Sequence, residues 1–164
     1  MSQPTAGAST RTSRIIAAPP KHLYAAFIDP AALVEWLPPG EMTGVMHDFD
    51  AREGGGYTMS LFYPPTEHTQ PGKTAEREDR VHVRFVALEP PRRIVEAVRF
   101  ESPDASFHGE MTLTVTFSEA SGGTEVTLAF VNLPPGVRPE DNETGARQSL
   151  EQLARRFEGP HPLA

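Results

Sequence analysis

The chain has 164 residues and no cysteine, and its 15 Lys and Arg against 22 Asp and Glu give a formal net charge of −7. These values exclude a disulfide framework, a thiolate zinc site and a cysteine nucleophile, and the acidic balance argues against a nucleic-acid partner. The length predicts one domain. No apolar run approaches the roughly 18 residues of a membrane span, and the start is not built like a secretory signal, so we expect a cytoplasmic protein with no membrane span.

Five Pro-Pro pairs divide the chain into elements, because proline fixes φ and lacks a donor, and therefore belongs at helix starts and in loops. They stand at 19–20, 38–39, 64–65, 90–91 and 134–135. We expect a disordered tail over residues 1–10, a single domain over 11–159 and a short C-terminal tail over 160–164.

A strand and two short helices are predicted before residue 41. Residues 11–17 are β-compatible, and Pro19-Pro20 can open a helix where a missing N–H costs nothing. Asp29 is a good N-cap, and Pro30 is a good first residue, for a second helix that ends at residues 38–40. The sequence thus predicts two helices that meet at a tight corner.

Beyond residue 40 the hydrophobic period becomes two, which predicts strands over 43–49, 57–63, 81–85, 93–100, 111–118 and 126–130. The polar stretch from 64 to about 79 is predicted as a loop or a frayed hairpin end, and Gly122-Gly123 as a hairpin turn. Alternation with a polar opposite face is typical of an antiparallel sheet that is buried on one side only.

The last predicted element is a long amphipathic helix that begins at Pro139 and ends before Gly159-Pro160. Acidic residues near its start, and Arg155 and Arg156 near its end, suit the helix dipole. Its apolar residues form one stripe at helical spacing, namely Ala146, Leu150, Leu153 and Phe157. Since the sheet face is the one unpaired apolar surface, we predict an α+β fold in which this helix lies across the sheet.

Several motifs stand in an order and spacing that resemble a known group of proteins. They are Ile16-Ala17-Ala18-Pro19, Asp29-Pro30 followed by Trp36, Asp50-Ala51-Arg52-Glu53-Gly54-Gly55, Pro91-Arg92-Arg93-Ile94-Val95 and Gly145-Ala146-Arg147-Gln148-Ser149-Leu150. Together with the element order they resemble the START-like (helix-grip, SRPBCC) superfamily, and within it the family named after the activator of heat-shock protein 90 ATPase. The resemblance spans nearly all of residues 11–158. It implies a curved antiparallel sheet wrapped around a long C-terminal helix, with two short helices after the first strand.

The resemblance also implies a cavity between the sheet and the long helix, which in the superfamily holds lipids, sterols, polyketides or other apolar small molecules. Physical reasoning leads to the same expectation, because a strongly curved sheet cannot touch a single helix everywhere, and an apolar gap would stay dry and could accept a ligand. Members of the family usually carry Gly-Trp where this chain has Gly145-Ala146, and often two tryptophans where it has Trp36-Leu37. Loss of the indole should enlarge the cavity unless another side chain fills the space.

The residues predicted to line this cavity are apolar or aromatic and come from the second short helix, the inner face of the sheet and the last helix. Each of them can instead be ordinary core material. The candidates for ligand binding are Trp36, Phe49, Tyr57, Met59, Leu61, Val83, Phe85, Val98, Phe100, Met111, Leu113, Leu150 and Phe157.

Glu96 is the one weak candidate for a catalytic residue, because alternation can place it on the inner face with Ile94, Val98 and Phe100. Burial would raise its pKa and suit it to general acid or base work. The alternative register, with Glu96 facing solvent or paired with an arginine, stays open.

The histidines do not suggest a metal site. His47 lies beside Asp48, but neighbours in a strand point to opposite faces. We therefore expect no metal and no cofactor.

Three functions remain open from the sequence. The leading hypothesis is binding of a small apolar ligand, of the lipid, sterol or aromatic polyketide class, between sheet and helix without catalysis. One alternative is an enzyme of the cyclase or dehydratase type that uses the same cavity, and the other is a module that interacts with a chaperone, as the family name implies. The expected partners are thus a small apolar molecule or a chaperone, and the expected assembly is a monomer or a homodimer.

Overall fold

The computed structural model describes residues 7–64 and 78–158. Residues 1–6 of the tail predicted over 1–10, the tail predicted over 160–164 and most of the loop predicted after residue 64 lie outside the described residues. The elements are β1 (Ala8–Ile16), α1 (Pro20–Phe27), α2 (Pro30–Trp36), β2 (Thr43–Asp50), β3 (Gly56–Phe62), β4 (Glu78–Glu89), β5 (Arg93–Phe100), β6 (Met111–Ala120), β7 (Gly123–Leu133) and α3 (Pro139–Glu158), with a short 3-10 helix at Ala105–Phe107.

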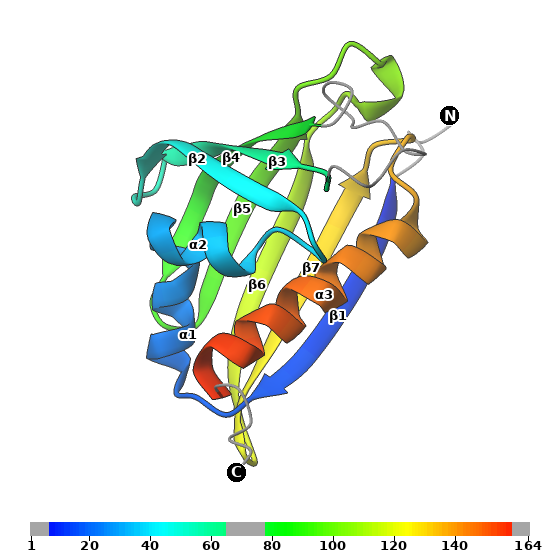
Figure 1. The fold of residues 1–164 in the computed structure, drawn as a ribbon. Coiled ribbons are helices and arrows are strands. Elements are labelled where there is room, and N and C mark those ends of the chain that lie inside the picture. The colour runs from blue at the N-terminus through cyan, green and yellow to red at the C-terminus, as the bar shows by residue number, and fades with distance from the viewer. Residues whose placement is uncertain (1–6, 65–77, 159–164) are drawn as a thin grey trace, which may run out of the picture.

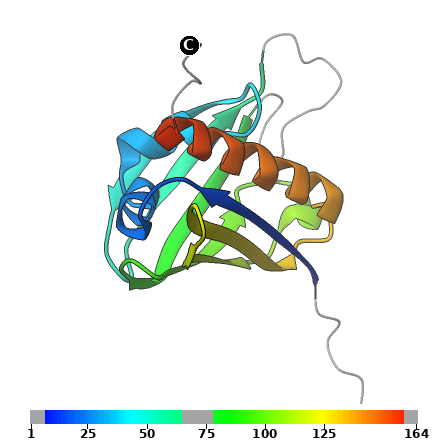
Figure 2. The same cartoon turned by 90° about the horizontal axis from the view of Figure 1, so that it is seen from below.

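The described strands form one seven-stranded antiparallel sheet in the order β1-β7-β6-β5-β4-β3-β2. The sheet curves around α3, which crosses its concave side, while α1 and α2 lie beside one end of that helix (Figures 1 and 2). The helix-grip fold predicted from the sequence is confirmed. The strand β1 begins at Ala8, earlier than predicted, because Ala8 pairs with Leu133 and Thr10 with Phe130 of β7.

The helices start and end where local chemistry allows. Pro20 and Pro30 occupy first-turn positions, and the carboxylate of Asp29 accepts hydrogen bonds from the backbone N–H groups of Ala31 at 3.0 Å and Ala32 at 3.4 Å. In α3 the first turn is acidic and the last turn is basic, as the helix dipole favours. No helix in the described ranges is long and apolar enough to cross a bilayer.

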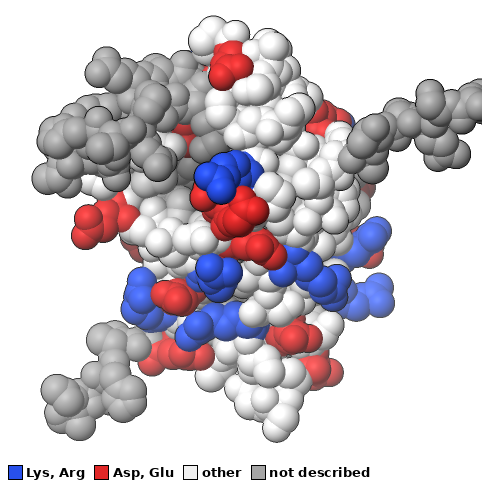
Figure 3. Space-filling model, turned by 90° about the vertical axis from the view of Figure 1, so that its right-hand side faces the viewer, with Lys and Arg blue, Asp and Glu red and all other residues white. Residues whose placement is uncertain are grey.

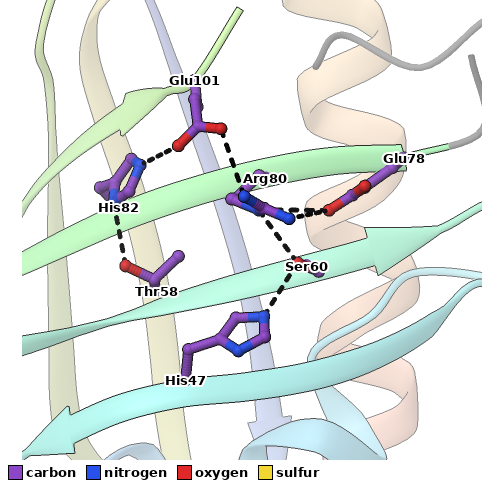
Figure 4. A network of polar contacts seen from close by, with 7 residues as sticks. All are labelled: His47, Thr58, Ser60, Glu78, Arg80, His82 and Glu101. Atoms are coloured by element: carbon purple, nitrogen blue, oxygen red, sulfur yellow. Dashed lines mark hydrogen bonds and ion pairs between the residues drawn. The ribbon is translucent and has the colours of Figure 1, made fainter. Parts of the chain in front are cut away.

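The core lies between the concave face of the sheet and the three helices. Alternate residues of each central strand point into it, and α3 contributes its buried face of Ala146, Ser149, Leu150, Leu153 and Ala154. The opposite face of β3 and β4 carries polar side chains (Figure 4). The sheet is therefore buried on one side only, as the alternation in the sequence predicts.

Candidate functional site

A cavity of about 460 Å³ lies between the concave face of the sheet, α2 with the segment that follows it, and the N-terminal half of α3. Side chains from β3, β4, β5, β6 and β7 form its floor. From α3, the wall includes Asp141, Gly145, Ala146 and Ser149. The C-terminal half of α3 packs against its neighbours instead, since Leu150, Leu153 and Ala154 are fully buried and do not line the cavity.

The wall at α2 is held in place by Trp36. Its indole N–H donates to the backbone carbonyl oxygen of Ala26 at 3.0 Å, and its ring meets Phe27 edge-on with centroids 4.7 Å apart. A buried indole with its polar atom satisfied is rigid. This contact fixes the corner between α1 and α2, and with it one side of the cavity.

Two polar side chains of α3 fasten that helix to the end of α2. The Oγ of Ser149 donates to the carbonyl oxygen of Leu37 at 2.7 Å, and the Nε2 of Gln152 donates to those of Trp36 and Pro38, each at 2.7 Å. They satisfy carbonyl groups that the end of a helix leaves without an internal partner. The middle of α3 is thus tied to α2, while its first turns extend over the sheet and roof the cavity.

Glu96 brings a carboxyl group into the apolar floor. It stands on β5 between Phe85 of β4 and Leu113 of β6, and its side chain lines the cavity with a residue exposure of 4%. No described residue forms a hydrogen bond or an ion pair with it. Burial raises the pKa of Glu96 to about 8. Around pH 7 the group therefore keeps its proton and can both donate and accept a hydrogen bond.

Tyr57 of β3 is a second buried polar group in the wall of this cavity. Its pKa lies well above the usual value, first because of burial and second because of the charge of Glu96. Phe49 stacks on its ring with centroids 5.4 Å apart and fixes its orientation. The hydroxyl group of Tyr57 thus stays protonated and available as a donor.

Further polar side chains in the wall of the cavity come from β4 and α3. Asp79 is buried and accepts a hydrogen bond from the Tyr63 hydroxyl at 2.9 Å, while Asp141 and Thr144 of α3 are exposed. Among the described residues that line the cavity, three are acidic and none is Lys, Arg or His. The cavity therefore combines apolar walls with groups that are neutral or negative.

Two of the histidines, His47 and His82, lie on the outer face of the sheet. There His47, Thr58, Ser60, Glu78, Arg80, His82 and Glu101 form a network of hydrogen bonds and ion pairs (Figure 4). His82, for example, contacts Glu101 at 3.0 Å and Thr58 at 2.9 Å. In the described part of the chain, no group of three or more His, Asp or Glu side chains could hold a metal ion.

The charged surface does not form a strong patch of one sign on the side that Figure 3 shows. There the Lys and Arg side chains of the described residues form a band with acidic side chains along its borders. Proteins that bind nucleic acids usually present a continuous basic stripe or patch. This face of the molecule does not have that form.

A family model for activator of Hsp90 ATPase homolog 1-like proteins matches residues 17–158. This range contains α1, α2, six of the seven strands and all of α3. The chain belongs to this family. It is an AHSA1-like protein, and the resemblance of its motifs is confirmed.

Solved structures with this AHSA1-like fold include protein CV1439 from Chromobacterium violaceum, at 31% sequence identity and a TM-score of 0.78, covering 91% of this chain and 96% of that one. The AHSA1 protein from Silicibacter pomeroyi has 20% identity and a TM-score of 0.75, covering 92% and 98%. A protein from Mycobacterium smegmatis has 20% identity and a TM-score of 0.71, covering 93% and 92%. A comparison with curated proteins gave no match.

Eight of the thirteen residues predicted as ligand-binding line the cavity of this AHSA1-like protein: Trp36, Tyr57, Leu61, Val83, Val98, Phe100, Met111 and Leu113. The other five do not. Met59, Phe85 and Leu150 are fully buried in the core, and Phe49 and Phe157 pack against it from its margin. Alternation places Met59 and Phe85 on the inner face of the sheet, but neighbouring side chains bury both completely.

Other cavity-lining residues of the AHSA1-like protein were not predicted. They include Pro39 and Met42 after α2, and Asp141, Thr144 and Gln148 on α3. These residues are polar, or lie outside regular elements, so hydrophobic periodicity could not reveal them. Ala146, the position at which the resemblance to the family implies a tryptophan in other members, lines the cavity. The resemblance to the family at this position was the signal in the sequence that indicated a cavity wall on α3.

Proposed function

We propose that this protein binds a small, largely apolar molecule in the cavity beneath α3, without catalysis. The observation that carries the proposal is the open apolar space under Ala146, whose volume of about 460 Å³ falls in the range of small-molecule sites. Mostly apolar walls with a few buried polar groups, here Glu96 and Tyr57, are the usual composition of such a site.

The cavity resists collapse because its walls are fixed independently of any ligand. The bonds of Ser149 and Gln152 hold α3 at a set distance from α2, and Trp36 is locked by its bond to Ala26. Atoms that line an empty space lack contact partners on one side. A ligand that supplies these contacts gains affinity without requiring a rearrangement of the fold.

Binding of Nile red, an uncharged dye whose fluorescence rises in apolar surroundings, tests the proposal. We expect saturable binding to the intact chain. At one hundred times its dissociation constant, any ligand of the native state stabilises it by about 2.7 kcal/mol, which corresponds to a rise in Tm of about 5 to 10 °C for a chain of this length.

The location of the dye is tested with a matched pair of substitutions on α3. Ala146→Trp fills the cavity and should weaken dye binding more than tenfold, whereas Arg147→Trp adds the same side chain on the exposed side of the helix and should leave binding unchanged. Equal binding by the two variants would contradict the proposal.

A second candidate is acid–base catalysis in the same cavity, because Glu96 is a buried carboxyl group with a pKa near neutrality. Such a group can remove a proton from the carbon beside a ketone and return it. If so, decan-2-one in heavy water should take up deuterium at those carbons in the presence of the protein, and the Glu96→Gln variant should not catalyse the exchange. No enhanced exchange with the intact chain would reject this candidate.

The third candidate, an interaction with a chaperone, is supported by the description of the family alone. The large apolar side chains that are exposed among the described residues come from five different strands: Ile15, Val45, Phe62, Val86 and Val131. A docking surface usually gathers such residues into one patch. The cavity is therefore a stronger argument for ligand binding than the exposed apolar side chains are for an interaction with a chaperone.

A further inference from the structure

The ionisable side chains in the described wall of the cavity are acidic groups and tyrosines. Glu96 comes from β5, Asp79 from β4 and Asp141 from α3, and no described lining residue is Lys, Arg or His. A carboxylate ligand would therefore find no cationic partner among the described residues of the wall. Fatty acids and other apolar anions fit this wall poorly.

No described residue forms a hydrogen bond or an ion pair with Glu96, although this residue is only 4% exposed. Nearly all buried polar groups in folded proteins are hydrogen-bonded, and an exception calls for a ligand or another specific explanation. The carboxyl group stands in the wall of a cavity large enough for a small molecule. A ligand in the cavity can supply the hydrogen bonds that no described residue makes with this group.

We propose that the ligand class is a lipophilic amine, whose ammonium group forms an ion pair with Glu96 while its apolar body fills the space beneath Ala146. This inference rests on the proposed function and adds the chemistry of the head group to it. Among the groups that could satisfy a buried carboxyl, a cation makes the strongest hydrogen bonds. The aromatic rings of Trp36 and Tyr57 in the same wall also favour a cation over an anion.

Binding of an ammonium group requires Glu96 to release its proton. Glu96 holds a proton near pH 7, and an ammonium ion pairs with the carboxylate form, so that ligand and site together release up to one proton. The other titratable groups in the described wall are Tyr57 and Tyr63 from β3 and its end, Asp79 from β4 and Asp141 from α3. Of these, Tyr57 is the group that the charge of Glu96 affects.

Three probes with the same ten-carbon body separate the head groups: decylamine, decanol and decanoate, each used below its micelle concentration to displace Nile red. We expect decylamine to compete at least about tenfold better than decanol, because a charge-assisted hydrogen bond is roughly twice as strong as a neutral one. Decanoate should compete least. The affinity for decylamine should rise from about pH 6 to about pH 8, while the amine itself stays charged, and the affinity for decanol should not rise.

Glu96→Gln is the decisive variant, because it keeps the shape of the side chain and removes its charge. It should bind Nile red and decanol as the intact chain does, lose the preference for decylamine and lose the pH dependence. Glu119→Gln removes the same charge from an exposed position outside the cavity and should change nothing. This control separates the site from a general attraction of amines to an acidic protein.

Two results would overturn the proposal while leaving the binding function intact. One is equal competition by decylamine and decanol, and the other is an amine preference that persists in Glu96→Gln. If Nile red does not bind to the intact chain at all, the proposed function fails, and the inference about the amine fails with it.

Discussion

The side-chain amide of Gln152 on α3 donates a hydrogen bond to the backbone carbonyl oxygen of Trp36 at the end of α2, with 2.7 Å between nitrogen and oxygen. The same amide reaches Pro38, also at 2.7 Å. These bonds join two helices that are more than one hundred residues apart in the chain. They fix the distance between α3 and the end of α2, and with it the position of α3 over the cavity.

Gln152→Ala should therefore destabilise the fold by about 1 to 2 kcal/mol, because it leaves two carbonyl groups without their donor. The unfolding free energy in urea measures the loss. Gln148→Ala is the matched control, since Gln148 lies one turn earlier on α3 and no bond between its side chain and a described residue is seen. An equal loss in both variants would show that the Gln152 bonds contribute little.

Removal of the Tyr24 hydroxyl group should have the opposite effect on stability. Its hydroxyl group is buried and finds no hydrogen-bond partner among the described residues. Because Tyr24→Phe removes an unsatisfied polar atom and keeps the contact of the ring with Phe117, it should leave stability unchanged or raise it by up to about 1 kcal/mol. Tyr63→Phe, which breaks the bond to Asp79, should lower stability. Thermal unfolding of the two variants gives the comparison, and a clear loss of stability in Tyr24→Phe would contradict it.

Glu96 should make the stability of the protein depend on pH. Burial raises the pKa of Glu96 from 4.5 to about 8, so the folded state holds the proton more tightly than the unfolded state does. Its contribution to stability is thus fully present below about pH 4.5 and is lost as the pH rises through about 8. Glu96→Gln should abolish this slope, and urea unfolding at several pH values measures it. A difference between the two proteins that stays constant with pH would disprove the assignment.

Filling the cavity should stabilise the empty protein. Ala146→Leu places apolar atoms in the open space and should raise the unfolding free energy by about 0.5 to 2 kcal/mol. Ala154→Leu places the same atoms against a packed part of the core, where Ala154 is 1% exposed and does not line the cavity. That variant should lose about 1 to 3 kcal/mol. If both variants lose similar amounts of unfolding free energy, the space beside Ala146 cannot hold the added side-chain atoms.

The sequence predicted the fold well because each element carries its own local signal. Alternation along 111–118 and 126–130 indicated strands with one buried face, and the stripe from Ala146 to Phe157 indicated the helix that covers them. The order of these elements, with the motifs of the family, then left few arrangements of the chain to consider.

The site was predicted less completely, because alternation tells which face of a sheet a residue occupies and not what covers it there. Met59 and Phe85 share a face with Tyr57 and Val83, yet only the latter two reach the cavity. The orientation of Glu96 stayed open because both faces of β5 are apolar, and the structure resolves it by burying Ile94, Glu96 and Val98 together. The polar rim on α3 has no periodic signal at all.

Intermolecular nuclear Overhauser contacts between decylamine and the methyl groups of the protein locate the bound ligand. Met111 lines the cavity and Leu153 is packed outside it, so the two methyl groups report on different places under the same helix. Binding in the cavity beneath α3 predicts contacts from the decyl chain to Met111 and none to Leu153, and their loss in Ala146→Trp. Contacts to the outer face of the sheet, or contacts to Met111 that survive in Ala146→Trp, would contradict it.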